Sequence, residues 1–273
     1  MQLDENRIVI RPRSHLDVMD LALRVIREYA WPLLVALAIG AVPVMGFNAW
    51  LLADFADVDF VEAEFAYARY MALMLLLVIW EMPLVTAPVT LYLGQALFTD
   101  RPQPREVARG FVDSLGQMLW YQVLLRAFWV PLVFTWVFLF AVWPYLNEVV
   151  LLERNPMWAR EPGQMTTARR RRALHVGYVA DLFARWLASL AIATALFLAC
   201  WFSIWLAGRM LVNEWELTGA TFTVCFPLAL WLVVGYFTVV RFLGYLDLRI
   251  RREGWDVELT LRAERARLMR QMS

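Results

Sequence analysis

Two charged residues lie inside long apolar stretches of the sequence, where an ionised side chain is costly. Glu81 and Arg126 each follow about eleven residues of an apolar segment, and a charge at mid-bilayer costs about 2.5–3.5 kcal/mol on insertion scales. On antiparallel neighbouring helices the two would reach the same depth, so we predict an intramembrane ion pair. One interpretation is a proton or ion site beside a helix broken at Pro83. The plainer alternative is a structural pair, or an Arg126 that lies at an outer turn among headgroups.

Other residue types that commonly do chemistry are scattered. His15 and His175 are far apart, and Cys200 and Cys225 both lie in apolar runs. The sequence contains no Gly-rich phosphate loop, no nucleophile elbow and no metal-ligand spacing. We therefore expect no catalytic residue, no cofactor, no metal and no nucleic-acid partner, and we favour a non-enzymatic role.

The composition predicts an all-α membrane protein. Hydrophobic residues make up 61% of the 273 residues, against about 45–50% in soluble domains. Several apolar runs exceed the roughly 18 residues that a spanning helix needs. We expect a bundle of about six transmembrane or re-entrant helices, with segments near residues 31–52, 70–98, 115–152 (two segments), 186–207 and 220–245. Pro83 and Pro88 should kink or break the second segment.

The chain reads as one polytopic domain of residues 1–273 with three parts. Residues 1–30 hold an interfacial helix, which Ser14 should cap and His15 should begin, because apolar residues recur at spacings of three and four. Residues 31–245 form the membrane bundle. Residues 246–273 form an amphipathic cytoplasmic tail helix, whose acids, Asp247 among them, we expect to pair with arginines of the 99–113 and 153–181 loops.

The arginine distribution predicts the topology. All 26 basic residues are Arg, and 21 of them lie in residues 1–30, 99–113, 153–181 and the tail, whereas the acidic loops 54–64 and 210–218 have none. The positive-inside rule then places both termini in the cytoplasm of a bacterial inner membrane. It also requires residues 115–152 to enter the membrane and return, as a full hairpin or a re-entrant pair. The alternative is one long tilted helix and five spans. We expect Arg241, near the inner end of the last span, to snorkel.

Two further features concern contacts with partners. Small residues recur at spacing four along one predicted span, at Ala191, Ala195, Ala199, Ser203 and Ala207. Such a ridge lets helices approach closely in lipid, and its partner is either a helix of the same chain, which we favour, or another subunit. The cluster Arg169, Arg170, Arg171 and Arg172 either contacts anionic lipid or only holds its loop in the cytoplasm, which we consider the stronger reading.

Two stretches resemble known proteins. Residues 144–156 (PYLNEVVLLERNP) and 245–258 (YLDLRIRREGWDVE) resemble segments of a family of uncharacterised bacterial polytopic membrane proteins. The tail is also similar to the end of the membrane domain associated with some glycerophosphodiester phosphodiesterases. The catalytic domain of those enzymes is absent, so the resemblance implies a multispan protein without an assigned activity.

These features favour a non-enzymatic scaffold or accessory subunit of a membrane assembly. Its partners would be the lipid bilayer and another membrane protein or a second copy of the chain. The alternative is a small-solute or ion transporter or channel that uses Glu81 and Arg126, and a lipid-acting enzyme comes third.

Overall fold

The described part of the chain is mainly helical. The computed structural model describes residues 14–56, 63–97, 99, 102–124, 145–212 and 219–253, and every regular element in these ranges is a helix. The predicted all-α fold is confirmed for them. Residues 125–144, on which the predicted hairpin or re-entrant pair and the number of six segments depend, lie outside the described part of the chain.

Four helical segments of the described chain are long and apolar enough to cross a membrane. They cover Ala30–Leu51, Ala66–Ala96, Val179–Leu211 and Thr221–Arg251. Each contains most of one predicted segment, and the last two extend the prediction by about one to two turns. Charged residues such as Asp181, Arg185 and Arg251 lie in these extra turns. Because hydropathy falls at charged residues, the predicted segments were shorter than the helices.

The first helix begins where its capping signal predicts. Helix α1 (His15–Glu28) has Ser14 as its N-cap, with the Ser14 hydroxyl accepting from the Asp17 amide and the Asp17 carboxylate accepting from the Ser14 amide. This reciprocal pair is a capping box, which satisfies two otherwise unpaired backbone donors. After Tyr29 the chain continues into α2 (Ala30–Leu51) and the short α3 (Ala53–Ala56).

The second span is broken by its prolines, as predicted. Helix α4 (Ala63–Val85) ends one residue before Thr86, and α5 (Ala87–Ala96) begins one residue after it. Pro83 and Pro88 donate no backbone hydrogen bond, so the helix cannot continue unchanged through this region. The Thr86 hydroxyl donates to the Met82 carbonyl at 2.7 Å and stabilises the bend locally.

The predicted polar loop at residues 99–113 is wrong for most of its length. Helix α6 (Pro104–Met118) occupies it and continues as the π-helical turn η2 (Leu119–Leu124). The helix is amphipathic, since Gly110, Ser114 and Met118 are buried at spacing four while its charged residues are exposed. The arginines of this segment led to its interpretation as a loop, although Pro104 is typical of the first turn of a helix.

The remaining helices lie between residues 146 and 253. Described structure resumes with α9 (Leu146–Glu148) and the π-helical η3 (Val149–Glu153), followed by α10 (Thr167–His175) and the long α11 (Val179–Val212). The π-helical η4 (Thr221–Cys225) leads into α12 (Phe226–Glu253). Helix α10 lies inside the predicted 153–181 loop.

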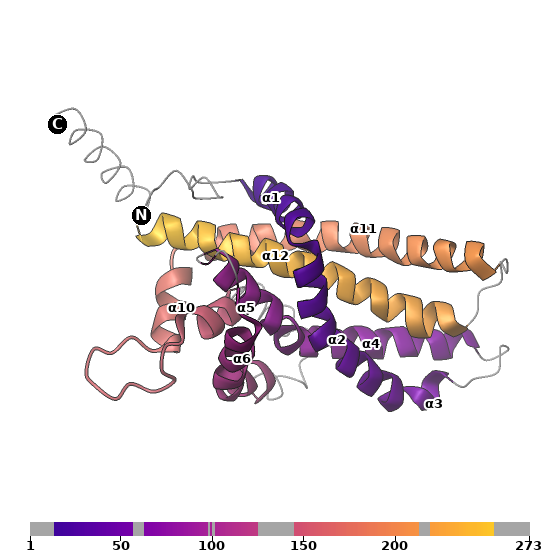
Figure 1. Ribbon diagram of the computed structural model, residues 1–273, viewed down its shortest axis with the longest axis horizontal. Coiled ribbons are helices and arrows are strands. Elements are labelled where there is room, and N and C mark those ends of the chain that lie inside the picture. The colour runs from indigo at the N-terminus through magenta and orange to yellow at the C-terminus, as the bar shows by residue number, and fades with distance from the viewer. Residues whose placement is uncertain are drawn as a thin grey trace.

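Helix α12 forms the centre of the bundle. It contacts α1, α2, α4, α5, α10 and α11; Figure 1 shows α4, α11 and α12 running lengthwise while α2 crosses them obliquely. The crossing of α2 with α4 is close at Gly40, where a Cβ would lie 2.2 Å from the Val85 carbonyl oxygen. Trp231 and Tyr245 of α12 are among the largest fully buried side chains.

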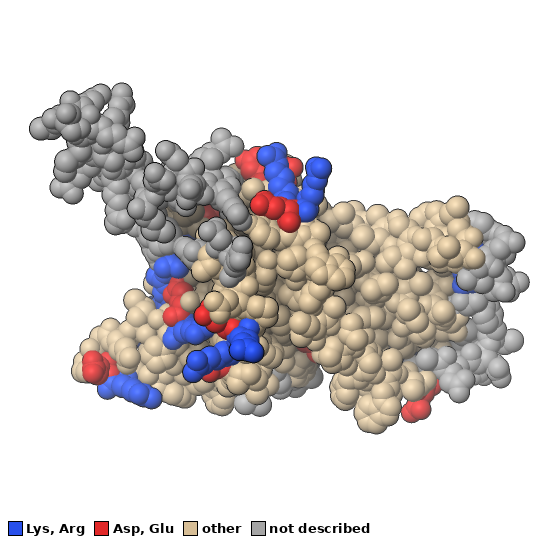
Figure 2. All heavy atoms as spheres, viewed as in Figure 1, with Lys and Arg blue, Asp and Glu red and all other residues tan. Residues whose placement is uncertain are grey.

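Charged side chains gather at one end of the molecule. In Figure 2 the blue and red residues lie mainly over α1, α6 and α10, and a broad band over α2 and the far half of α11 shows almost none. In Figure 1 this charged end, with α6 and α10, lies opposite α3. The face seen in Figure 2 is therefore charged mainly at one end and apolar along the rest of its described surface.

Candidate functional site

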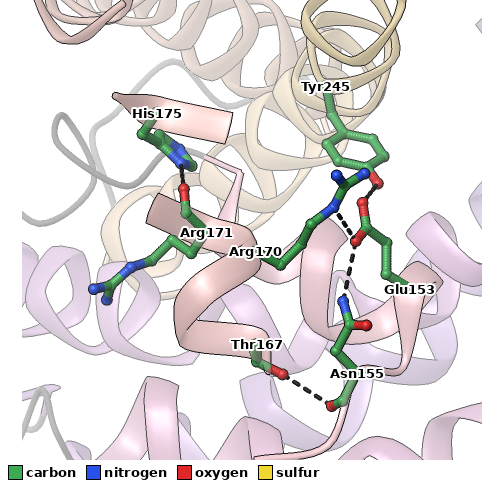
Figure 3. Close-up of polar contacts among 7 residues, drawn as sticks. All are labelled: Glu153, Asn155, Thr167, Arg170, Arg171, His175 and Tyr245. Atoms are coloured by element: carbon green, nitrogen blue, oxygen red, sulfur yellow. Dashed lines mark hydrogen bonds and ion pairs between the residues drawn. The ribbon is translucent and has the colours of Figure 1, made fainter. Parts of the chain in front are cut away.

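A group of part-buried polar contacts surrounds Glu153 at the end of η3 (Figure 3). Its carboxylate is 9% exposed and accepts from Arg170 Nε at 2.5 Å, Tyr245 Oη at 2.6 Å and Asn155 Nδ2 at 3.1 Å. The donors come from α10, α12 and the turn after η3. One carboxylate thus joins three parts of the chain, and charge-assisted bonds of this kind are about twice as strong as neutral ones.

The turn after η3 is fixed by its own contacts. Arg154 has a left-handed backbone with φ 49°, which terminates the π-helical turn and reverses the chain. The carbonyl oxygen of Asn155 then accepts from Gln117 Nε2 at 2.7 Å and from Thr167 Oγ1 at 2.9 Å. The turn is therefore anchored to both α6 and α10, and Glu153 is held in place beneath Arg170.

Electrostatics favour an ionised Glu153. Burial alone would raise the pKa of Glu153, but hydrogen bonds from Arg170 and Tyr245 and the nearby charges of Arg170 and Arg249 outweigh it. The pKa of Glu153 therefore lies below its ordinary value of 4.5. The carboxylate is charged at neutral pH and serves as an acceptor for all three donors.

His175 lies on the same helix as Arg170 and is held neutral. Its Nδ1 donates to the Arg171 carbonyl oxygen at 2.7 Å, because a carbonyl can only accept. Burial is the main cause that lowers the pKa of His175 below 6.5, with the Arg171 charge adding to it. Its Nε2 is buried and has no hydrogen-bond partner among the described residues, so protonation there would place an unpaired charge inside the protein.

Further ion pairs lie along the C-terminal half of α12. Arg241 Nε donates to Glu148 Oε1 at 2.6 Å, and the Glu148 side chain is 0% exposed. One and a half turns later, Asp247 pairs with Arg185 of α11 at 3.6 Å and with Arg251 at 2.9 Å. The expectation that Arg241 snorkels is wrong, because the α9 carboxylate provides it with a buried partner.

The expected pairing of Asp247 also differs from the structure. Two arginines that pair with it, Arg185 and Arg251, lie on α11 and α12, outside the 99–113 and 153–181 loops. The link between the last span and the 153–181 segment is made by Tyr245 and Arg170 through Glu153 instead. Tail residues 254–273 lie outside the described part of the chain.

Glu81 of the predicted intramembrane pair has a neutral partner. Asn48 of α2 is fully buried, and its Nδ2 donates to Glu81 Oε2 at 2.8 Å. Arg126, the predicted partner, lies outside the described residues, so the Glu81–Arg126 pair stays a prediction. Asn48 was visible in the sequence as a polar residue within an apolar run.

The arginine cluster lies on α10, where two of its side chains are partly buried and two are exposed. Arg170 binds Glu153 and Arg171 is half-buried, whereas Arg169 and Arg172 are exposed. Two of the four side chains are thus available at the surface, and contact with anionic lipid stays a prediction.

The small-residue ridge lies on the outside of α11. All five members are exposed: Ala191, Ala195, Ala199, Ser203 and Ala207. In the most apolar stretch of α11 no residue is buried. We favoured a helix of the same chain as the partner of this ridge. Among the described residues no helix covers it.

The arrangement binds helices together, and among the described residues it offers no metal site, because no group of three or more His, Cys, Asp or Glu could hold an ion. Sequence reasoning missed Glu148, Glu153 and Tyr245 as site residues. The signal that could have found the first two was present: both are acids within or at the end of an apolar run.

The two stretches that carry the family resemblance lie against each other. Tyr145 and Tyr245 have ring centroids 6.3 Å apart, and Tyr145 Oη lies 2.7 Å from where a Cβ on Gly244 would be. The resemblance itself stays a prediction. No protein-family model, curated protein or solved structure matches the chain.

Proposed function

We propose that the chain is a multi-pass integral membrane protein that acts as a non-enzymatic scaffold or accessory subunit of a membrane assembly. The four apolar helical segments support a membrane location. The arginine bias of the sequence supports a bacterial inner membrane with both termini in the cytoplasm. The exposed Arg169 and Arg172 would then face anionic headgroups of the inner leaflet.

The observation that carries the proposal is the outward position of the ridge on α11. Long apolar side chains cover lipid-facing surfaces well, whereas Ala and Ser leave a shallow strip along which another helix can approach closely. Leu190, Leu198 and Phe202 flank the strip and are also exposed. This face suits a second helix as well as lipid.

The partner that we propose is α11 of a second copy. Two copies inserted with the same topology present parallel α11 helices, and a twofold axis along the membrane normal brings each ridge onto the same ridge. The contact is self-complementary because small residues recur at spacing four from Ala191 to Ala207, so the same strip is present on both copies. The resulting dimer would be the unit that other components of the assembly bind.

The test is the oligomeric state of ridge variants in lipid nanodiscs. Ala195→Leu with Ala199→Leu adds bulk on the ridge, and Thr194→Leu adds similar bulk on the exposed surface beside it. We expect a dimer for the unaltered chain and for Thr194→Leu, and a monomer for the double variant. An unaltered chain that is monomeric, or a double variant that remains dimeric, would contradict the proposal.

A further inference from the structure

Helix α6 packs beside the end of one of the four long apolar segments. It begins at Pro104, eight residues after the segment Ala66–Ala96 ends, and it contacts α5. A Cβ on Gly110 of α6 would lie 3.6 Å from Leu91 Cδ2 of α5. Leu91 is five residues before the end of that segment, which is about 7.5 Å along the helix axis. In a bilayer, α6 would therefore lie where the hydrocarbon meets the headgroups.

The side of α6 that packs on the bundle is bordered by an exposed apolar flank. Successive residues of an α-helix are about 100° apart, so positions three and four apart share a side. Gly110, Ser114 and Met118 form the buried side. Beside it, Val112 is 63% exposed and Leu119 is 46% exposed. The residues that share this position around the helix, and that we call the apolar flank, are Ala108, Val112, Leu115 and Leu119.

The charged residues of α6 follow in order beyond the apolar flank. Arg105 and Arg109 are exposed and project directly next to it. Glu106 and Asp113 are also exposed, and they project beyond the arginines, roughly opposite the apolar flank. The sides of the helix are therefore buried, apolar, basic and acidic, in that order around its axis.

A membrane surface provides this order of surroundings. With the buried side against the bundle, the apolar flank faces the acyl chains, the two arginines face outward at the level of the headgroups, and the two acids face water. Moving one Val or Leu side chain out of water contributes about 1.5–3 kcal/mol. A guanidinium binds phosphate oxygens through two parallel hydrogen bonds. The charges seen over α6 in Figure 2 lie beside the apolar body of the molecule, as this position requires.

We propose that α6 is an amphipathic membrane anchor, whose apolar flank lies among acyl chains and whose Arg105 and Arg109 bind the phosphates of anionic lipids. This site is on a different helix from Arg169 and Arg172, the exposed arginines of α10. It depends on the membrane location of the chain, but not on the scaffold role or on the contact between α11 helices.

Spin labels on neighbouring residues test the position of the apolar flank. In a chain with Cys200→Ser and Cys225→Ser, the single variants Val112→Cys and Asp113→Cys carry a nitroxide, and the protein is placed in nanodiscs of phosphatidylcholine and phosphatidylglycerol. We expect the label at 112 to collide mainly with oxygen, which concentrates in lipid, and the label at 113 to collide mainly with a water-soluble nickel complex. A label at Val42, which is 64% exposed on α2, reports the bilayer itself.

The label at Val42 separates two kinds of failure. If it lies in lipid while the label at 112 lies in water, α6 is not an anchor and the membrane location stands. If both labels lie in water, the membrane location fails as well. Equal collision rates at 112 and 113 would also overturn the proposal, because the two residues would then not face different surroundings.

Lipid titration tests the two arginines separately. Native mass spectrometry of the full chain in detergent measures the occupancy by phosphatidylglycerol, with phosphatidylcholine as the neutral lipid for comparison. Arg105→Gln and Arg109→Gln should each weaken phosphatidylglycerol binding about fivefold, since a basic residue at an anionic surface contributes about 1 kcal/mol. Arg160→Gln, an exposed arginine in the loop before α10, is the matched control and should leave it unchanged. Unaltered binding in both α6 variants, or an equal loss in Arg160→Gln, would contradict the assignment of the phosphate contacts to Arg105 and Arg109.

Discussion

The phenolic hydroxyl of Tyr245 donates to the carboxylate of Glu153 at 2.6 Å, across 92 residues of sequence. The same carboxylate binds Arg170, so one buried charge holds the last span, α12, against the segment that precedes α11. Because Tyr245 is 0% exposed, this bond can form only when both segments are in place. It therefore reports the assembly of the end of the bundle where α10 and α12 meet.

Removing the Tyr245 hydroxyl should weaken the fold. Tyr245→Phe keeps the ring beside Tyr145 but loses a hydrogen bond to a charged group, and we expect a loss of about 1.5–3 kcal/mol in the free energy of unfolding. Denaturant titration in detergent micelles measures it. Tyr236→Phe is the control, because Tyr236 makes a longer bond to the neutral Met19 carbonyl at 3.3 Å. Equal losses in the two variants would show that the charge on Glu153 contributes nothing.

Acid should destabilise the protein through His175. Its pKa is lowered by burial, so between that pKa and 6.5 the unfolded chain binds more protons than the folded one, and stability falls as the pH falls. Glu153 follows the same sign, but its stabilisation is lost only below 4.5. We expect a drop in Tm from about pH 7.5 to about pH 5.5 that is smaller in His175→Asn.

His15→Asn controls for the other histidine. The pKa of His15 is also lowered, mainly by burial and then by Arg185, but its side chain is less buried than that of His175. It should therefore account for the smaller part of the acid effect. If His175→Asn lost as much stability on acidification as the unaltered chain, burial of this imidazole would not explain the effect.

Gly40 should tolerate no side chain. A Cβ there would lie 2.2 Å from the Val85 carbonyl oxygen, and backbone cannot move aside as a side chain can. We expect Gly40→Ala to cost at least about 3 kcal/mol, the upper end for overpacking, as measured by thermal unfolding in micelles. Gly46→Ala in the same helix meets nothing within 4 Å and should be neutral or stabilise by about 0.5–1 kcal/mol. Similar effects at the two positions would disprove the close crossing of α2 and α4.

Replacing only one member of the Glu148–Arg241 pair should reduce the free energy of unfolding more than replacing both. Arg241→Met leaves a fully buried carboxylate without its partner, which costs about 3–5 kcal/mol. The double variant Arg241→Met with Glu148→Leu removes both charges and should recover part of that loss. A double-mutant cycle in the free energy of unfolding measures the coupling, and additive effects would show that the two residues do not interact.

Local features of the fold followed directly from the sequence. The Ser14 cap, the break at Pro83 and Pro88 and the four apolar helices were all predicted, because each depends on neighbours within a few residues or on composition. Helix α6 was missed because its arginines were interpreted as a loop, although Gly110, Ser114 and Met118 mark a buried face at helical spacing.

Contacts between side chains that are distant in the sequence could not be predicted from it. The pairs Glu148–Arg241 and Glu153–Tyr245 depend on how α9 and η3 lie against α12, and no spacing along the chain encodes that placement. The apolar region 115–152 contains both Arg126 and Glu148, and only Arg126 was predicted to form an ion pair. The ridge on α11 was recognised from its spacing, but the direction in which it faces required the structure.

Disulfide mapping along α11 in native membranes shows directly whether its ridge contacts a second copy. Cys200 and Cys225 are first replaced by Ser, and single cysteines are then placed at Ala191, Ala195, Ala199, Ser203 and Ala207, with Leu190 and Thr194 as positions off the ridge. We expect disulfide-linked dimers on mild oxidation at several ridge positions, spaced by four residues, and few at the other two. Equal cross-linking at all seven positions, or none on the ridge, would contradict it.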